Sequence, residues 1–392
     1  MADENEIVVR YKDQAYQVET QTPGITEESI ADADRRIGMD WRSSRVTIEI
    51  TRDNINDFCN YMGSSNPLFL DEEYARKTRW GGIIAPSAMV GTAIIAPGMR
   101  GVQWIYAGTE WEFFQIMRPG DIIVMRGRYL GGVQKKGAAV SQWYMQKGET
   151  ICTNQRGELV ARAQVYCART PRRQAEGGMQ YEARNRAWSA DELESIEKAM
   201  LNEGVRGSEL RYWEDVVVGE EIRSVAYGPL RAVDIALTGS FTDTGVYSAE
   251  GEAHAGGHVY QLIHRRRHPA DTYVDPVTGI QDHPHRGHWE SFMAQEVGMP
   301  GVYDVGPHRV SWLCRFITDW MGDDAFLKKL SGWLRRPNVV SDVTYMKGTV
   351  EEKWVENGET LVRCQLLGIN QEEQVTMPGS AVVRLPSRSV QE

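Results

Sequence analysis

The sequence predicts an α+β protein made of two similar halves, each an antiparallel sheet wrapped around one central helix. Arg118–Asp121 in the first half and Asn338–Asp342 in the second each precede a run in which apolar and polar residues alternate. Such alternation is typical of a strand with one buried face. Thr51, ahead of the apolar Ile55, indicates a helix start in the first half, and Arg231 precedes a similar pattern in the second. Matching pieces in the same order favour an internal duplication.

A change of composition between the halves predicts three parts. Residues 1–170 would form the first domain, residues 171–206 a polar linker, and residues 207–392 the second domain. Within the linker, Ser189 and Glu192 have the spacing of a capping box, and apolar residues follow at helical spacing. We therefore expect a short helix between the halves.

Length and composition are those of a globular protein with two or three domains. The chain has 392 residues, of which 41% are hydrophobic and 25% are charged. Its net charge of −10 argues against a nucleic-acid-binding protein. No run of roughly 18 apolar residues occurs, so we expect no membrane span. The acidic N-terminus lacks the apolar core of a signal peptide, and the expected location is the cytoplasm.

Residue spacing also limits the cofactors. The five cysteines are scattered and form no C-x-x-C pair, so the sequence indicates neither a zinc site nor a disulfide framework. His283, His285 and His288 lie close together near two carboxylates, but their spacing matches no zinc motif. No glycine-rich dinucleotide loop follows a predicted strand. We expect no metal and no redox cofactor.

Two segments in corresponding parts of the halves carry the most informative pattern. Residues 64–75 read S-S-N-P-L-F-L-D-E-E-Y-A, and residues 288–301 read H-W-E-S-F-M-A-Q-E-V-G-M-P-G. Both resemble the active-site signature of MaoC-like hydratases, the (R)-specific enoyl-CoA hydratases with a hotdog fold. That signature reads approximately S-G-D-x-N-P-x-H-x-D and is followed by a helix and a glycine-rich stretch.

The two segments differ in the residues that the chemistry needs. The family's catalytic Asp falls on Ser64 and its His on Phe69, and phenylalanine cannot transfer a proton. In the second segment His288 takes the position of the catalytic His, ten residues before Gly298. The resemblance therefore implies a double hotdog of the two-domain type. Its N-terminal half would be a degenerate, FAS1-like dehydratase partner, and its C-terminal half would hold the active site.

The resemblance also implies an activity, the reversible hydration of a 2-enoyl-CoA to a 3-hydroxyacyl-CoA. In the family an Asp and a His share the proton transfers, and a backbone N–H near the start of the central helix binds the thioester oxygen. The expected partner is the acyl-CoA thioester, so coenzyme A enters only as part of the substrate. A monomer and a homodimer formed through the sheets are both compatible with two hotdogs in one chain.

The carboxylate partner of His288 departs from the family pattern. The position five residues before His288 holds His283 rather than Asp. Asp282, one residue earlier, is the favoured catalytic carboxylate. Asp243 is the alternative, and it would make residues 245–281 an insertion between the catalytic Asp and His.

Further residues are expected to orient His288 or to bind the substrate. Glu290 either forms a hydrogen bond with His288 or caps the helix that follows. Arginines near the insertion are candidates to hold the phosphates of coenzyme A, because guanidinium groups match phosphate geometry. A Y-x-x-G turn and an asparagine of the first half would shape the acyl pocket. The candidate substrate-binding residues are Gly301, Tyr303, Gly306, Arg265, Arg266, Arg286 and Asn66.

Two other functions use the same fold. A hotdog thioesterase would direct water at the thioester carbonyl rather than at C3, and it would release free CoA. A non-catalytic acyl-CoA-binding subunit would bind the ligand without turnover. The family resemblance favours the hydratase over both.

Overall fold

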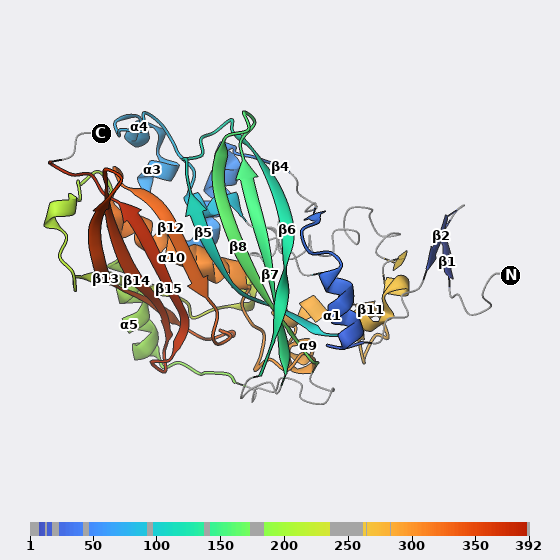
Figure 1. The fold of residues 1–392 in the computed structure, drawn as a ribbon. Coiled ribbons are helices and arrows are strands. Elements are labelled where there is room, and N and C mark those ends of the chain that lie inside the picture. The colour runs from blue at the N-terminus through green and yellow to red at the C-terminus, as the bar shows by residue number, and fades with distance from the viewer. Residues whose placement is uncertain are drawn as a thin grey trace.

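The computed structural model describes most of the chain and shows one continuous sheet with helices packed on it (Figure 1). The described residues are 8–11, 14–17, 23–41, 47–91, 97–136, 142–172, 184–235, 262–263, 265–282 and 284–389. The large sheet is 11-stranded, and each of its strand pairs is antiparallel. The α+β class predicted from the sequence is confirmed.

Each half contributes its own set of strands to this sheet. Those of the first half are β3 (Asp40–Trp41), β4 (Thr47–Glu49), β5 (Gln103–Phe113), β6 (Ile122–Lys135), β7 (Trp143–Thr153) and β8 (Leu159–Thr170). Those of the second half are β9 (Glu221–Tyr227), β12 (Phe326–Trp333), β13 (Thr344–Glu356), β14 (Glu359–Asn370) and β15 (Val375–Arg384).

The two sets of strands have the same order, which supports the internal duplication. The first half pairs as β4–β6–β7–β8–β5 and the second as β9–β13–β14–β15–β12. The halves meet where β5 pairs with β12, with Trp111 opposite Leu330 and Glu112 opposite Lys329. The sequence predicted two sheets, and this pairing joins them into one (Figure 1).

Helices and two small hairpins complete the described structure. The helices are α1 (Glu27–Asp34), α2 (Arg52–Met62), α3 (Pro67–Leu70), α4 (Glu72–Arg76), η1 (Ser87–Val90), α5 (Ala190–Leu201), η2 (Trp213–Asp215), η4 (Pro269–Asp271), η5 (Pro284–His288), α9 (Ser291–Glu296) and α10 (Gly306–Met321). The hairpins are β1 (Val8–Tyr11) with β2 (Gln14–Gln17) and β10 (Tyr273–Val274) with β11 (Gln281–Asp282). Within the described residues, no helix is both long enough and apolar enough to span a membrane.

Several local signals in the sequence appear as the expected elements. Thr51 caps α2 by accepting a hydrogen bond from the N–H of Asn54. Ser189 and Glu192 form a complete capping box at the start of α5. β6 begins directly after Asp121 and β13 begins shortly after Asp342. The residue boundaries of the two domains stay predictions.

α10 is the central helix of the second half and is buried along most of its length. It contacts β12 and β15 of its own half and β5 of the first half, and Figure 1 shows it behind the line where the halves meet. The helix approaches the sheet closely because Gly332 and Gly379 lie opposite each other in β12 and β15. A Cβ atom on either glycine would lie 2.8 Å from Cδ1 of Leu313. The small residues thus set the spacing between helix and sheet.

Residues of the first half contact both ends of α10. Near its start, Nε2 of His308 lies 2.7 Å from the carbonyl oxygen of Tyr61 in α2. Beyond its end, the hydroxyl of Tyr74 donates to Oδ2 of Asp323 at 2.5 Å, and the indole N–H of Trp80 donates to the Asp323 carbonyl at 2.6 Å. Apolar residues of both halves belong to one continuous core.

We expect Gly379→Ala to lower the free energy of unfolding by roughly 1–3 kcal/mol, because overpacking in a filled core forces backbone shifts. The added Cβ would lie 2.5 Å from the carbonyl oxygen of Ser331, which belongs to the paired strand and cannot rotate away. Chemical denaturation measures the change. Gly82→Ala is the matched control, since a Cβ there meets nothing within 4 Å. Equal stability of the two variants would contradict the prediction.

Candidate active site

His288 lies inside the second half, at the end of η5. Its imidazole is buried, its Nδ1 is 2.8 Å from the carbonyl oxygen of Tyr303, and the two rings pack with centroids 4.1 Å apart. A carbonyl oxygen only accepts, so Nδ1 carries the proton and Nε2 carries the lone pair. Burial lowers the pKa of His288 to about 4, and the hydrogen bond to Tyr303 opposes this shift. The ring is therefore neutral at pH 7, with a lone pair on Nε2.

Tyr303, which accepts the hydrogen bond of His288, also leads into the start of α10. Tyr303 lies three residues before Gly306, where α10 begins. Val305 is the N-cap of this helix and makes no side-chain capping bond, and Pro307 occupies its first turn. Backbone N–H groups at a helix start favour a negative charge. The residue whose carbonyl orients His288 is thus three positions from a helix N-terminus.

The segment that contains Tyr303 is fixed by the loop ahead of β13. Tyr303 and Val339 form an antiparallel bridge, and the N–H of Asp304 donates to the Asn338 carbonyl at 3.0 Å. The side-chain amide of Asn338 donates to Oγ1 of Thr344 at 2.8 Å. The position of the carbonyl that holds His288 therefore depends on this loop.

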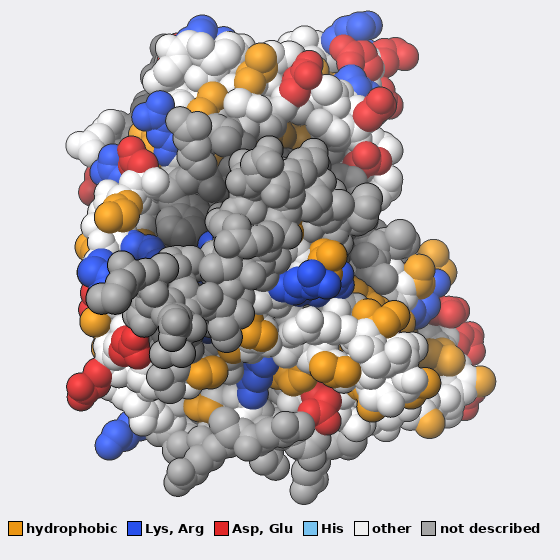
Figure 2. Space-filling view, turned by 90° about the vertical axis from the view of Figure 1, so that its right-hand side faces the viewer, with side chains coloured by type: hydrophobic (Ala, Val, Ile, Leu, Met, Phe, Trp, Pro, Cys, Tyr) orange, Lys and Arg blue, Asp and Glu red, His pale blue; other side chains and the backbone are white. Residues whose placement is uncertain are grey.

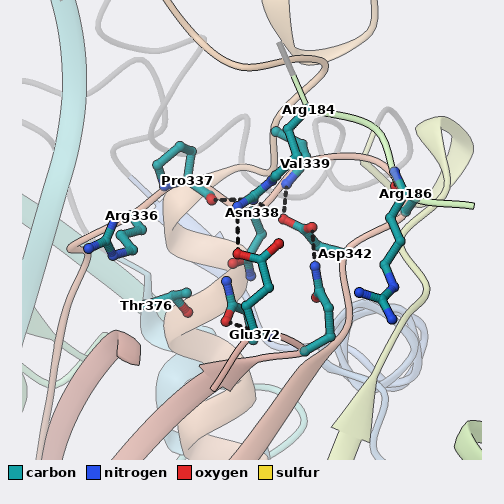
Figure 3. Close-up of polar contacts among 12 residues, drawn as sticks. Arg184, Arg186, Arg336, Pro337, Asn338, Val339, Asp342, Glu372 and Thr376 are labelled. Atoms are coloured by element: carbon teal, nitrogen blue, oxygen red, sulfur yellow. Dashed lines mark hydrogen bonds and ion pairs between the residues drawn. The ribbon is translucent and has the colours of Figure 1, made fainter. Parts of the chain in front are cut away.

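The carboxylate of Asp342 holds this loop in place (Figure 3). Its buried carboxylate accepts from the N–H of Val339 at 2.9 Å, from the side-chain amide of Gln371 at 2.8 Å and from the guanidinium of Arg184. Arg184 also lies 4.0 Å from Glu372. A buried carboxylate is tolerated because it has such partners, so these contacts hold the loop in one conformation.

A buried ion pair lies next to this loop. Nε of Arg309, in the first turn of α10, is 3.1 Å from Oδ2 of Asp304, and both side chains are almost fully buried. Arg309 also donates to the Arg336 carbonyl and to Oγ1 of Thr376, each at 2.7 Å. Burial raises the pKa of Asp304 to about 6, and the charge of Arg309 opposes the rise.

The sequence analysis assigned no role to Asp304, His308 and Arg309, which lie within or shortly after the predicted Y-x-x-G turn. Burial lowers the pKa of His308 to about 4, and its ring lies between Tyr61 and Trp312. A signal for these contacts is present in the sequence. Ionisable side chains recur within the apolar helix, and a buried charge requires a partner close by.

Glu290 and Arg286 differ from their expected roles, because each is a partner of the other. The guanidinium of Arg286 donates to Glu290 at 2.7 Å and to the carboxylate of Asp275 at 3.0 Å. Glu290 stands at the N-cap of α9 but makes no capping hydrogen bond with its side chain. Two carboxylates thus already bind the guanidinium that was expected to hold a phosphate.

The other predicted arginines lie on a helical turn of the insertion. Arg265 donates to the carbonyl of Gln281 at 3.0 Å, and Arg266 is exposed. Neither has a described contact with Tyr303 or His288.

The groups around the predicted glycines and Asn66 are side chains and backbone of the protein. A Cβ on Gly306 would collide with the ring of Tyr106 from β5, so a side chain, rather than a ligand, explains why glycine is needed there. A Cβ on Gly301 would lie 3.4 Å from the Arg184 carbonyl oxygen, an ordinary contact distance. Oδ1 of Asn66 accepts from the N–H of Leu68 at 3.0 Å and so caps α3.

Ser64 and Phe69, at the degenerate positions of the first half, also contact neighbouring groups of the protein. Phe69 is buried in the common core. The hydroxyl of Ser64 accepts from the N–H of Asn66 at 3.3 Å. Within the first half these two side chains stabilise the turn around α3, and neither supplies an acid or a base.

The carboxylate partner of His288 stays a prediction with two alternatives. Asp243 lies outside the described residues, as do His283 and residues 245–261 of the expected insertion. The backbone of Asp282 belongs to β11 and pairs with Tyr273, but its side chain is not described. Among the side chains that are described, no three His, Cys, Asp or Glu residues are grouped as a metal site would need.

Comparisons with known proteins agree with this architecture. Residues 35–163 match the family model of the FAS1-like dehydratase domain region. No curated protein matches the chain. The family model covers most of the first half, including the degenerate segment around Phe69.

Solved structures extend the likeness to both halves. A MaoC-like dehydratase is 12% identical and has a TM-score of 0.59, with 90% of this chain and 100% of that chain covered. A MaoC domain dehydratase from Chloroflexus aurantiacus J-10-fl is 14% identical, with a TM-score of 0.55 over 95% and 100% of the two chains. A Mycobacterium tuberculosis protein described as a double hotdog is 11% identical, with a TM-score of 0.50 over 90% and 97%. The fold is a double hotdog, and the predicted resemblance to MaoC-like proteins is confirmed.

We expect the imidazole of His288 to titrate with a midpoint of about 4 rather than 6.5, because burial disfavours its charged form. The folded state then binds fewer protons than the unfolded state between these values. The stability that this group contributes is complete above about pH 6.5 and is lost as the pH falls toward 4. NMR of labelled histidine, assigned with His288→Asn, measures the midpoint. A midpoint near 6.5 would show that the ring is accessible to water.

We expect Asp342→Asn to lower the free energy of unfolding by about 2 kcal/mol, because Arg184 loses its charged partner while the amide keeps part of the hydrogen bonding. Glu372→Gln is the control and should change stability by less than about 0.5 kcal/mol, since this pair is longer and more exposed. Thermal and chemical unfolding of both variants give the comparison. Similar losses of stability in the two variants would show that Asp342 does not hold this loop in place.

Proposed function

We propose that this chain catalyses the reversible addition of water to a 2-enoyl-CoA thioester, with His288 as the proton acceptor. The observation that supports the proposal is the hydrogen bond from Nδ1 of His288 to the Tyr303 carbonyl. It fixes the tautomer that leaves the lone pair on Nε2, and the residue that accepts this bond lies three positions before α10. The dehydratase-type fold is consistent with this chemistry.

Hydration requires a base, a proton donor and a group that stabilises the enolate. In the proposed reaction Nε2 of His288 takes a proton from water as the water oxygen bonds to C3. The electron pair of the C2–C3 double bond moves toward C2, and charge develops on the thioester oxygen. The backbone N–H of Gly306 would stabilise that charge, since Pro307 has no N–H and the N–H of His308 donates to the Val305 carbonyl at 3.1 Å. A proton delivered to C2 completes the addition, and the reverse sequence removes water.

The proton donor to C2 would be a carboxylate of the second half. Asp282 and Asp243 remain the two candidates. A single His can also return the proton that it took, which would make the carboxylate a positioning group. We further propose that the ligand is an acyl-CoA thioester, that no cofactor takes part, and that the protein works in the cytoplasm.

Turnover of aliphatic, branched and aromatic enoyl-CoA thioesters, followed by mass spectrometry, tests the proposal. We expect a gain of one water with CoA still attached. His288→Asn should reduce kcat/KM by roughly 10²–10⁴-fold, the usual contribution of a general base. The Asn amide can still donate to the Tyr303 carbonyl, so folding should be retained, whereas His288→Ala removes both features.

The other outcomes separate the alternative functions. Free CoA as a product would indicate a thioesterase. Binding of CoA thioesters without turnover of any of them would indicate a non-catalytic subunit. Full activity of His288→Asn would show that His288 takes no part in the reaction.

A further inference from the structure

We propose that Gln103, Thr170, Arg172 and Tyr273 form a binding site for a hydroxyl group on the acyl chain of the substrate. Identifying the ligand as the acyl chain of a CoA thioester rests on the proposed function. The site adjoins His288 through Tyr303, and it would determine which acyl groups the protein accepts.

Gln103 and Thr170 lie side by side at one end of the first half. Gln103 is the first residue of β5 and Thr170 is the last residue of β8, and the two are directly opposite each other in the antiparallel ladder. Side chains that are opposite in such a ladder project from the same face. Each residue is only 4% exposed, yet Oε1 of Gln103 and Oγ1 of Thr170 have no hydrogen-bond partner among the described residues. Buried polar atoms are rarely left in this state, so both indicate a ligand that supplies the partner.

Arg172 and Tyr273 extend this group of side chains. Arg172 lies two residues after Thr170 and donates to the carbonyl of Thr272 at 3.4 Å. Its guanidinium stacks on the ring of Tyr273, 4.3 Å from the ring centre. Nε of Arg172 and the hydroxyl of Tyr273 are also buried, and within the described part of the chain neither has a hydrogen-bond partner. Four neighbouring side chains therefore each hold one unpaired polar atom.

The unpaired atoms indicate the chemistry of the ligand. Nε of Arg172 is a donor, Oε1 of Gln103 is an acceptor, and the hydroxyls of Thr170 and Tyr273 can be either. A hydroxyl group matches this set because it can donate to one neighbour and accept from another. A carboxylate matches it less well, since it cannot donate to Gln103 and the charge of Asp271 already acts on Arg172.

The site adjoins the candidate base. The side chain of Gln103 forms a hydrogen bond with Tyr303, whose ring packs on His288 with centroids 4.1 Å apart. Tyr273 and Tyr303 belong to one apolar cluster with Ile105, which follows Gln103 by two residues in β5. Buried groups suit the acyl chain, which leaves water on binding, better than the phosphates of coenzyme A, whose charges are costly to bury. The site would therefore receive a part of the acyl chain beyond C3.

The surface next to the site is consistent with a ligand that carries a hydrocarbon chain. Figure 2 views the side of the molecule on which α1 and β11 lie, and apolar side chains are exposed among the charged ones over its lower half. β11 pairs with β10, which begins with Tyr273, and Val274, Val277 and Ile280 of this hairpin are exposed. Exposed apolar side chains of this kind favour contact with an apolar ligand.

Pairs of 2-enoyl-CoA thioesters that differ only in a terminal methyl or a terminal hydroxyl, at increasing chain lengths, test the inference on the whole protein. We expect one chain length at which kcat/KM is higher for the hydroxyl member by about tenfold or more, because the methyl member leaves the buried polar atoms unpaired. Equal kcat/KM within every pair would overturn the inference, and it is the result expected if these atoms bind only water.

Thr170→Val and Tyr273→Phe each remove a hydroxyl while keeping the shape of the side chain. We expect either variant to lower kcat/KM for the hydroxyl member and to raise it for the methyl member, so that the preference falls by about threefold to tenfold. Tyr166→Phe is the matched control and should keep the preference, because the hydroxyl of this β8 residue donates to Glu110 at 2.7 Å. An equal fall for both members of a pair would indicate a structural role and overturn the site.

Thermal unfolding of the same variants tests whether the two hydroxyls are unpaired in the free protein. Removing an unpaired hydroxyl breaks no hydrogen bond, so we expect neither Thr170→Val nor Tyr273→Phe to lower the Tm. A lower Tm in both variants would show that these hydroxyls bond within the protein, which would contradict a ligand site.

Failure of the site and failure of the proposed reaction give different results. If no enoyl-CoA is hydrated, calorimetric binding of the matching saturated acyl-CoA thioesters replaces turnover, and a hydroxyl preference that Tyr273→Phe weakens would support the site while refuting the reaction. Hydration without any hydroxyl preference would overturn the site and leave the reaction in place. A stronger preference for a terminal carboxyl than for a terminal hydroxyl would overturn the hydroxyl as the group that is recognised.

Discussion

The structure depends on the burial of α10 against strands from both halves. The helix packs against β12, β15 and β5. Gly332 and Gly379 let it lie close to the sheet, because a Cβ atom on either would lie 2.8 Å from Cδ1 of Leu313. Its two ends are held by the first half, through Tyr61 near the start and Tyr74 after the end. The apolar area buried by this helix supplies much of the shared core. The halves are consequently parts of one folded unit rather than two independent domains.

The two halves differ in the side chains that they hold at corresponding positions. In the second half, Tyr303 lies three residues before the buried α10, and its carbonyl fixes the tautomer of His288. In the first half, the matching positions hold Ser64 and Phe69, which stabilise local structure. A duplicated chain can divide its tasks in this way, because one copy of a site is enough for catalysis.

Buried polar contacts of the second half limit how far this region can change. Asp342 with Arg184 and Asp304 with Arg309 are pairs whose charges would be costly to leave unpartnered. Both pairs act on the segment that leads into α10. The same burial lowers the pKa of His288 and raises that of Asp304, so the desolvation that stabilises the fold also sets the protonation of groups beside the candidate site.

The sequence by itself determined the class, the duplication, the helix starts at Thr51 and Ser189, and the loss of chemistry at Phe69, because periodicity and capping are local properties. Only the tertiary structure decided which polar groups meet. Arg286 pairs with Glu290 and Asp275, and the space beside Gly306 is taken by Tyr106, a residue 200 positions earlier. Such contacts depend on how β5 pairs with β12 and how α10 lies behind them, and no spacing along the chain encodes that geometry.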